Sequence, residues 1–236
     1  MLEVIAAPNI HSPLPGEALD IGSGNGELVG AVRARFGLRT SACDSSDTLM
    51  KDPTQRVDIV DLNADKLPYL DGRFSLVTCI ETIARVEQIR PILREIFRVL
   101  EPGGLTVIST PNILNLPSRL SYCMTGFFSR FHPLPILERS QPRGYINPVG
   151  YFYLAHALLE TGFLHLEPRI DRCERRSRVS WTILFLPIKI AGLFFWLREK
   201  NKFRTITPEN RGLVATVNSR DLLLGRTLIV CARKPM

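Results

Sequence analysis

The sequence predicts an α/β fold built on a doubly wound, mostly parallel β-sheet, and three observations support this prediction. Short apolar runs alternate with helical patterns over the first 112 residues, which is the rhythm of successive βαβ units. A turn with glycine at every second position, 22–26, follows the first apolar run. A proline-glycine-glycine turn, 102–104, leads into the fifth. Right-handed crossovers then place helices on both faces of the sheet and bring the carboxyl ends of the strands to one crevice, where ligands bind in such folds.

The first half of the chain contains five predicted strands, at 17–21, 38–43, 57–60, 74–80 and 104–110. A helix is expected from Glu27 to about Phe36, directly after the glycine turn. A second helix, from Ile89 to Leu100, has its apolar residues near a 3.6-residue period, at 89, 92, 93, 96, 97, 99 and 100. We expect Pro102-Gly103-Gly104 to end this helix and start the fifth strand.

The second half is less regular. Prolines interrupt a stretch rich in aromatic residues and arginines between 113 and 148: Pro117, Pro133, Pro135, Pro142 and Pro148. A helix is then expected from Asn147-Pro148 to about Leu159, followed by strands at 164–170 and 226–232. The sequence therefore predicts one domain, 1–170 plus 226–236, interrupted by an insertion at 171–225.

The size and the cysteine content of the chain limit the classes of protein to which it can belong. A chain of 236 residues with 45% hydrophobic composition can bury a full core as one domain with an insertion. Five scattered cysteines, an odd number without ligand spacing, indicate a reducing compartment, and the four dispersed histidines add no metal-binding pattern. Residues 1–16 show no basic start followed by a long apolar run, so we expect no signal peptide and a cytoplasmic location.

The net charge of +7 is concentrated in one segment. Ten basic and four acidic residues lie between His165 and Arg204, and they flank an apolar run, 181–197, that contains one charge, Lys189, and a tryptophan near each end. This run is short for a membrane span, which needs about 20 apolar residues. We expect 179–204 to lie in a membrane interface, with its basic residues on anionic lipid. A buried or dimer-forming helix and a true span remain alternatives, whereas nucleic-acid binding is not expected.

The segment Ala18-Leu19-Asp20-Ile21-Gly22-Ser23-Gly24-Asn25-Gly26-Glu27 is the most informative in the chain. Glycine lets the backbone approach a ligand closely, and the amides at the start of the next helix point toward the same place. The spacing is G-x-G-x-G rather than the G-x-G-x-x-G of dinucleotide-binding units, which argues against a nicotinamide oxidoreductase. Taken alone, such glycines often form only a turn.

Four further segments occur in the order expected of one family. They are Ser41-Ala42-Cys43-Asp44, Val57-Asp58-Ile59-Val60-Asp61-Leu62-Asn63, the passage from Leu67 to Cys79 with its L-P-x-x-D pattern, and Leu100-Glu101-Pro102-Gly103-Gly104 with the strand after it. With the glycine turn, they resemble the class I S-adenosylmethionine-dependent methyltransferases over about residues 16–112. The resemblance implies a Rossmann-like sheet of seven strands with the last antiparallel, S-adenosylmethionine as cofactor, and an unusually large insertion between strands six and seven.

The resemblance also implies roles for individual residues. The turn Gly22, Ser23, Gly24, Asn25 and Gly26 would cradle the cofactor. Asp20 would orient this turn or meet the ligand's ammonium group through water. Asp44, with Ser45, would accept the ribose hydroxyls, since both carboxylate oxygens are acceptors. Asp61, Leu62 and Asn63 would frame the adenine. Cys79, Ile80 and Glu81 would form the floor of the site, beneath the sulfonium of the cofactor. Asp20 and Asp44 could instead act only as caps, and Cys79 could belong to the core.

The sequence contains few motifs that would identify the binding site of the methyl acceptor. Where many relatives have a Glu-His pair after strand four, this chain has Ala84 and Arg85, so a histidine base or a metal there is not expected. His132 and Tyr145 are weak candidates for a catalytic base, and His156 is expected to be structural. No catalytic residue is assigned.

We therefore expect a methyltransferase that O-methylates an amphipathic small-molecule acceptor, a lipid-linked glycan or a quinone-like isoprenoid lipid, at the cytoplasmic face of the inner membrane. The alternative is a non-catalytic protein that binds S-adenosylmethionine as a scaffold, which the lost Glu-His pair would favour. The sequence does not indicate an oligomeric state.

Overall fold

The computed structural model describes residues 2–5, 16–135 and 144–236. Pro142 lies outside these residues, as does most of the segment 1–16, in which no signal peptide is expected. The chain forms two compact units. The sheet unit comprises 1–110, 156–168 and 229–236, and the helical unit comprises 111–155 and 169–228. The predicted insertion thus falls inside the helical unit, which also takes in the proline-rich stretch before it.

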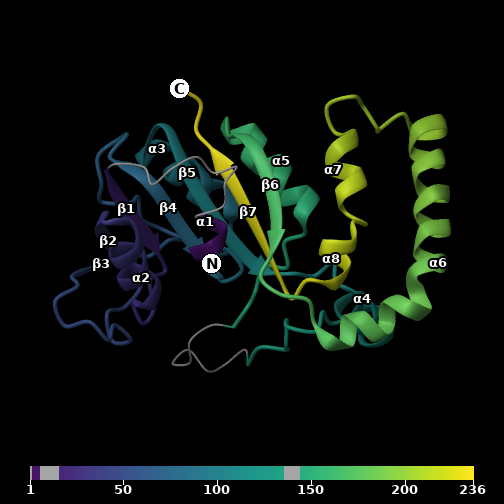
Figure 1. Ribbon diagram of the computed structural model, residues 1–236, viewed down its shortest axis with the longest axis horizontal. Coiled ribbons are helices and arrows are strands. Elements are labelled where there is room, and N and C mark those ends of the chain that lie inside the picture. The colour runs from purple at the N-terminus through teal and green to yellow at the C-terminus, as the bar shows by residue number, and fades with distance from the viewer. Residues whose placement is uncertain (1, 6–15, 136–143) are drawn as a thin grey trace. The chain divides into compact units, whose positions relative to one another are not determined.

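A seven-stranded sheet has the order β3-β2-β1-β4-β5-β7-β6 (Figure 1). Its strands are β1 (Glu17–Ile21), β2 (Arg39–Asp44), β3 (Val57–Ile59), β4 (Phe74–Ile80), β5 (Leu100–Pro111), β6 (Leu164–Ile170) and β7 (Thr227–Arg233). β1 pairs in parallel with β2 and β4, and β4 pairs in parallel with β5. β7 is antiparallel to β5, because the Lys234 amide donates to Gly104 at one end and the Asn112 amide to Arg226 at the other. The predicted fold class is confirmed.

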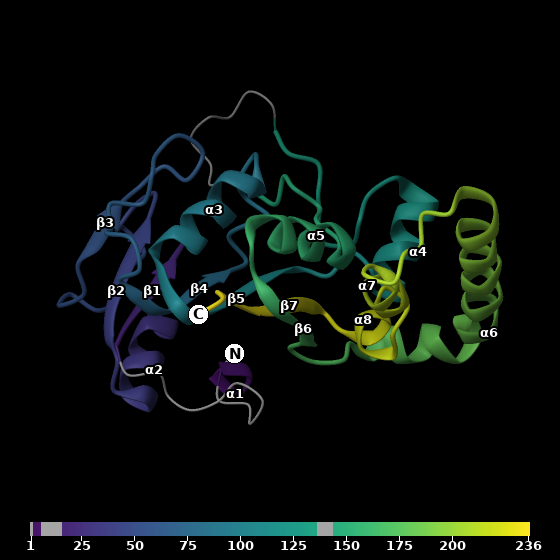
Figure 2. The same cartoon turned by 90° about the horizontal axis from the view of Figure 1, so that it is seen from above.

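Helices cover both faces of this sheet, as the crossover rule requires. Figure 2 shows α2 (Glu27–Phe36) on one face and α3 (Ile89–Val99) on the other. α2 buries Val29 and Val32, and α3 buries its stripe of Ile92, Leu93, Ile96 and Val99. A short helix, α1 (Leu2–Ile5), adds Ile5 to the core on the α2 side. Each such side chain contributes about 1.5–3 kcal/mol when fully buried.

The fifth strand begins earlier than the sequence predicts. α3 ends at Val99, and β5 starts at Leu100, which pairs with Phe74. The proline-glycine-glycine turn therefore lies inside the strand, where the pairing register shifts between Phe74 and Leu76. Gly103 adopts φ +78° there and donates its amide to the carbonyl of Lys234, the residue directly after β7. The glycines thus form a bulge, because the residue after β7 supplies a hydrogen-bond partner that lies far away in the sequence.

The helical unit contains a helix that the sequence analysis did not predict. α4 (Leu116–Thr125) begins at Asn115, whose side chain accepts the Ser118 amide at 2.8 Å, and it has Pro117 in its first turn. Gly126 ends the helix in the left-handed conformation. An N-cap asparagine, an early proline and a closing glycine are helix signals that the irregular surroundings obscured. α5 (Tyr151–Thr161) starts three residues later than Pro148.

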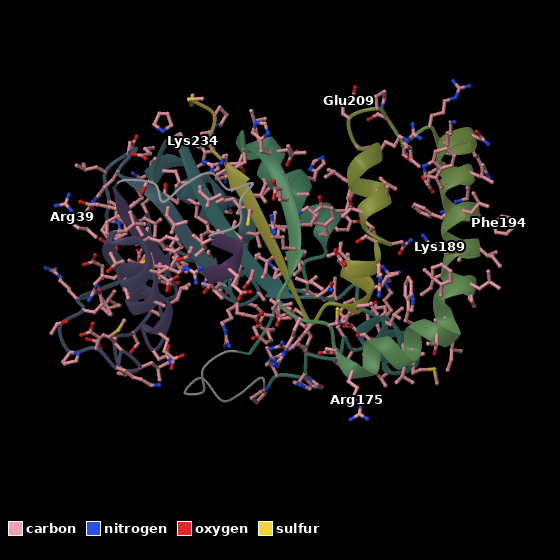
Figure 3. All side chains as sticks on the ribbon, viewed as in Figure 1. Arg39, Arg175, Lys189, Phe194, Glu209 and Lys234 are labelled. Carbon is pink, nitrogen blue, oxygen red and sulfur yellow. The ribbon has the colours of Figure 1, made fainter. Side chains whose placement is uncertain are left out.

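The longest helix, α6 (Arg175–Arg198), contains the whole apolar run and continues into a π-helical turn, η1 (Glu199–Phe203). The chain then returns through α7 (Arg211–Thr216) and α8 (Arg220–Leu224). Figure 3 shows that α6 bends between Arg175 and Lys189. Pro187 lies inside the helix and cannot donate to the fourth residue before it, which accounts for the bend.

The two ends of the insertion meet. Cys173 and Gly225 form an antiparallel bridge, and the Glu174 amide donates to Leu224. Asn112 binds the same place from β5: its buried amide group donates to the carbonyls of Leu222 and Gly225 at 2.7 and 2.8 Å. These contacts close the loop of inserted chain at its base.

We expect Asn112→Ala to destabilise the protein by about 2–4 kcal/mol, because it removes the hydrogen bonds to the buried carbonyls of Leu222 and Gly225, of which the Gly225 carbonyl keeps the Asn115 side chain as a donor. Thermal unfolding of the full chain followed by circular dichroism measures this. Asn201→Ala, at an exposed position of η1, is the matched control and should unfold like the unchanged protein. Equal stability of the two variants would show that the base of the insertion does not depend on Asn112.

Candidate functional site

The turn after β1 lies within the sheet unit and is held to the end of β2. The amides of Gly22 and Ser23 both donate to the Cys43 carbonyl, at 2.8 and 3.2 Å. The Gly24 amide donates to the Asp44 carboxylate at 2.8 Å. Three successive amides thus bind one strand end, and this fixes the shape of the turn before any ligand arrives.

All three glycines of the turn adopt positive φ, +73° at Gly22, +50° at Gly24 and +77° at Gly26. A Cβ at Gly22 would overlap with Thr82, and one at Gly26 would overlap with the Met50 side chain. At Gly24, by contrast, nothing lies within 4 Å of an added Cβ. The turn is therefore closely packed on two sides and open at Gly24, as a cradle for a ligand requires.

Asn25 shapes the entry of the turn into α2. Its side-chain amide donates to Glu27 at 2.7 Å, and its carbonyl oxygen accepts the Glu27 amide at 3.2 Å. Lys51 forms an exposed ion pair with Glu27 at 3.0 Å and donates its own amide to the Asn25 carbonyl. Asn25 thus acts on the turn through local bonds at the start of the helix.

Asp20 lies below the turn, at the end of β1. Its side chain is buried, and Thr78 of β4 donates a hydroxyl to it at 2.7 Å. Burial raises the pKa of Asp20 to about 7, and the charge of Asp44 adds to this effect. A carboxyl that titrates near neutrality next to a ligand cradle would favour a cationic group in the cradle when ionised.

Asp44 uses both carboxylate oxygens. One accepts the Gly24 amide, and the other accepts the Ser45 amide at 2.6 Å and the Ser45 hydroxyl at 3.2 Å. The oxygen that accepts from Gly24 has a second lone pair, so Asp44 can bind the turn and still accept from a ligand hydroxyl. The capping alternative and the ribose role are therefore compatible.

The loop after β3 is brought to the loop after β4. Asp61 accepts the Asn63 amide at 3.0 Å, and Asn63 accepts the Glu87 amide at 2.8 Å. Asp61 and Asn63 are exposed, and Leu62 is half-buried. Their contact with adenine stays a prediction.

The floor residues differ from one another. Cys79 has no exposed surface, which agrees with the core alternative, and burial raises its pKa well above that of a free thiol. Ile80 and Glu81 are half-buried at the end of β4. Glu81 has φ +57° and donates its amide to the Ser109 carbonyl at 3.0 Å. A non-glycine residue in this conformation is strained, and such strain is frequent at ligand sites.

Two residues at the cradle were missed by the sequence analysis. Thr82 packs behind Gly22 and donates its hydroxyl to the carbonyls of Ile21 and Ile80. Met50 packs against Gly26. Neither residue follows a spacing rule, because each reaches the turn from a different loop, so no sequence signal could have identified them.

The two candidate bases of the acceptor side stay predictions. His132 and Tyr145 belong to the helical unit, where the Phe131 and Tyr145 rings are tilted against each other with their centroids 5.6 Å apart and His132 is exposed. His156, on the exposed side of α5, faces Glu160 one turn later at 3.5 Å, as a structural surface pair would. Ala84 is buried. Within residues 2–5, 16–135 and 144–236, no group of three or more His, Cys, Asp and Glu could hold a metal ion.

Known proteins resemble the chain in sequence and in fold. A family described as "Methyltransferase domain" matches residues 19–108. A ubiquinone biosynthesis O-methyltransferase of Xanthomonas oryzae is 33% identical over 194 residues, covering 72% of this chain and 75% of that protein. A ubiquinone/menaquinone biosynthesis C-methyltransferase of Desulfotalea psychrophila is 26% identical over 156 residues, which is 63% of this chain and 60% of that protein.

Among solved structures, a SAM-dependent methyltransferase from Archaeoglobus fulgidus has a TM-score of 0.60 and 14% identity, covering 98% of this chain and 91% of that one. At this identity the likeness concerns the fold.

We expect Asp20→Asn to change how stability depends on pH. Because the folded pKa of about 7 lies above the unfolded value of 3.8, the folded state holds a proton that the unfolded state releases. Stability should therefore be fully present below about pH 4, fall as pH rises to 7, and then level off, a loss of about 4 kcal/mol. Asparagine keeps an acceptor for Thr78 and removes the titration.

Denaturant unfolding between pH 4 and pH 8 measures this slope. The variant should lose most of the slope in that window, while Asp47→Asn, at an exposed position, should keep it. An unchanged slope in Asp20→Asn would contradict the assignment.

Proposed function

The chain belongs to the class I S-adenosylmethionine-dependent methyltransferase family, and from this premise we propose that it methylates an amphipathic acceptor at a membrane surface. The observation that carries the enzymatic part is the preformed cradle, with three glycines at positive φ bound to the end of β2. The observation that carries the membrane part is α6, a long helix whose apolar side chains are exposed.

The cradle suits the family's cofactor. Open space at Gly24, acceptor oxygens on Asp44 and a buried carboxyl at Asp20 match a ligand with an amino-acid part, two ribose hydroxyls and a cationic centre. S-adenosylmethionine supplies an activated methyl group, so the protein's task is to bind and orient donor and acceptor in a reactive geometry. Ionised Asp20 would favour the cationic ligand.

For the acceptor, we propose a quinone-like molecule with a hydrocarbon tail, methylated on oxygen. The relatives support this proposal, because one is a ubiquinone biosynthesis O-methyltransferase and another a ubiquinone/menaquinone biosynthesis C-methyltransferase. A lipid-linked glycan has the same amphipathic character and is the alternative acceptor. Both are substrates that would be found at a membrane.

The surface of α6 supports attachment to a membrane. Ile183, Leu186 and Phe194 are 72%, 64% and 69% exposed, although each is a large apolar side chain. α6 and the turn after it form one helical segment, Val179–Phe203, long and apolar enough to cross a membrane by length and composition. Monomeric soluble proteins rarely expose an apolar surface of this extent. Basic residues lie at both ends of the helix, with Arg175 at its start and Lys200 over the Trp196 ring at 4.8 Å.

The path of the chain favours a helix on the membrane rather than through it. A span would place the residues after Phe203 on the opposite side from Arg175. Yet the chain returns within the same unit, since Gly225 bridges to Cys173 and the Asn218 side chain lies against Gly192. The return segment, 204–221, is polar and cannot cross a bilayer a second time. Lys189, near the middle of α6, would also be costly in the bilayer core.

We further propose the cytoplasmic face as the site of attachment, because both flanks of α6 are basic and anionic lipids attract such segments. A non-catalytic scaffold remains a second candidate, favoured by Ala84 and Arg85 where many relatives have an acid and a histidine. Cofactor binding without turnover of any membrane extract would support the scaffold.

The cradle generates a binding prediction. Asp44→Ala should weaken S-adenosylmethionine and S-adenosylhomocysteine at least about tenfold, roughly 1.4 kcal/mol, because it removes ligand acceptors and the anchor of the Gly24 amide. Gly24→Val should have a similar effect, since a β-branched residue is strained at φ +50° and fills the open space. Isothermal titration calorimetry measures both.

Asp47→Ala, which removes an exposed carboxylate three residues away, should bind like the unchanged protein. Tight binding of a nicotinamide cofactor, with no heat from either predicted ligand, would overturn the proposal.

The exposed helix generates a second prediction. On vesicles with anionic lipid at low salt, the intact protein should float with the vesicles, and rising salt should release it. Replacing both Leu186 and Leu193 by Glu should reduce flotation at least about tenfold, because two exposed apolar contacts are lost and two repulsive charges are gained.

Leu70→Glu is the matched control, since Leu70 is 79% exposed in the sheet unit, and it should float normally. An intact protein that stays in solution on anionic vesicles would overturn the membrane proposal and favour a dimer helix.

A further inference from the structure

A groove between α4 and α6 lies wholly within the helical unit. It has a volume of about 700 Å³ and is lined by Pro117, Leu120, Ser121 and Met124 of α4 and by Arg175, Val179 and Ser180 of α6. The α4 residues recur every three or four positions, so they form one face of that helix. Neither the family nor the relatives' names assign a ligand to this place.

The walls of the groove are apolar and open. Leu120 is 49% exposed, Val179 is 62% exposed and Met124 is 75% exposed, so their side chains remain in contact with solvent. The hydroxyl of Ser121 donates to the carbonyl of Phe127, just after α4, at 2.8 Å and so already has a partner. An extended peptide would have to leave backbone groups without partners against such walls, whereas a hydrocarbon chain has no polar groups to pair.

One end of the groove is cationic. Arg175 lines it, and Figure 3 shows its guanidinium pointing away from the ribbon at the start of α6. The start of this 24-residue helix also has positive partial charge, and the side chain of its N-cap residue, Glu174, makes no capping hydrogen bond. Glu174 is the acidic neighbour, and its own amide donates to Leu224. An anionic group would be stabilised at this end.

The groove is also continuous along α6 with the exposed apolar side chains that begin at Val179. We propose that the groove holds an acyl chain of an anionic phospholipid taken from the membrane, with the lipid phosphate beside Arg175. This inference rests on the proposed membrane contact but not on the methyl acceptor. The helical unit would then bind one lipid molecule specifically, in addition to any non-specific contact that its apolar and basic surface makes with the membrane.

The test is photo-crosslinking of the full chain on vesicles that contain phosphatidylglycerol with a diazirine in one acyl chain. Crosslinked peptides identified by mass spectrometry should include 117–124 of α4 as well as 179–180 of α6. Val179→Trp fills the groove and should reduce the α4 crosslinks at least fivefold while flotation persists. Ile183→Trp, exposed one turn later on the same helix and outside the groove, is the control and should leave them unchanged.

A second measurement separates the groove from membrane attachment. Dihexanoyl phosphatidylglycerol, used as a soluble lipid, should bind the intact chain in native mass spectrometry and should bind at least fivefold less to Val179→Trp and to Arg175→Gln. Arg198→Gln, at the other end of α6, should bind normally.

Each remaining outcome counts against one proposal. Flotation with crosslinks confined to 183–197 would overturn the groove and leave membrane contact intact. Binding of the soluble lipid without flotation would overturn membrane contact, and with it the membrane as the source of the lipid in the groove. Equal binding of uncharged dihexanoyl glycerol would overturn the anionic assignment, and displacement of the lipid by a quinone with a prenyl tail would assign the groove to the acceptor instead.

Discussion

The site depends on one set of hydrogen bonds, by which the turn after β1 is held to the end of β2. Gly22 and Ser23 donate to the same carbonyl of Cys43, and Gly24 donates to Asp44. Each bond contributes only about 1 kcal/mol, but together they set the backbone of the turn in a conformation that requires glycine. They form only when β1 and β2 are paired in parallel register, Ile21 beside Cys43. The cradle is thus a consequence of the sheet.

The same geometry explains why Asp20 titrates near neutrality. It lies inside the sheet at Thr78 of β4, where desolvation outweighs the hydrogen bond that it accepts. A buried carboxyl costs stability once it is ionised, and a cationic ligand beside it would offset that cost. The family's cofactor, whose methyl group is bound to a sulfonium, is such a ligand.

The helical unit keeps an apolar helix exposed to solvent while the rest of the chain stays folded. Its base is closed by Asn112, whose amide group serves the carbonyls of Leu222 and Gly225, and by the bridge between Cys173 and Gly225. Because the chain leaves and re-enters at one point, α6 can be solvent-exposed while the sheet is complete. An exposed apolar surface of this kind is typical of a site that a membrane, a lipid or another protein covers.

The sequence by itself determined the class of fold, six of the seven strand positions to within a residue or so, and the cradle at 22–26, because these depend on local patterns: apolar runs, glycine spacing and breaks in helical period. It did not predict the early start of β5 or the helix α4. Leu100 joins the strand through Phe74, and Gly103 is held by Lys234, which is 131 residues away. In the same way, Thr82 and Met50 reach the cradle from loops that no spacing rule connects to it. The apolar run at 181–197 could have been a buried helix; only the tertiary structure decided that it is exposed and that both its ends return to one unit. Burial depends on which elements pack together in space, and that information is not contained in the composition of one segment.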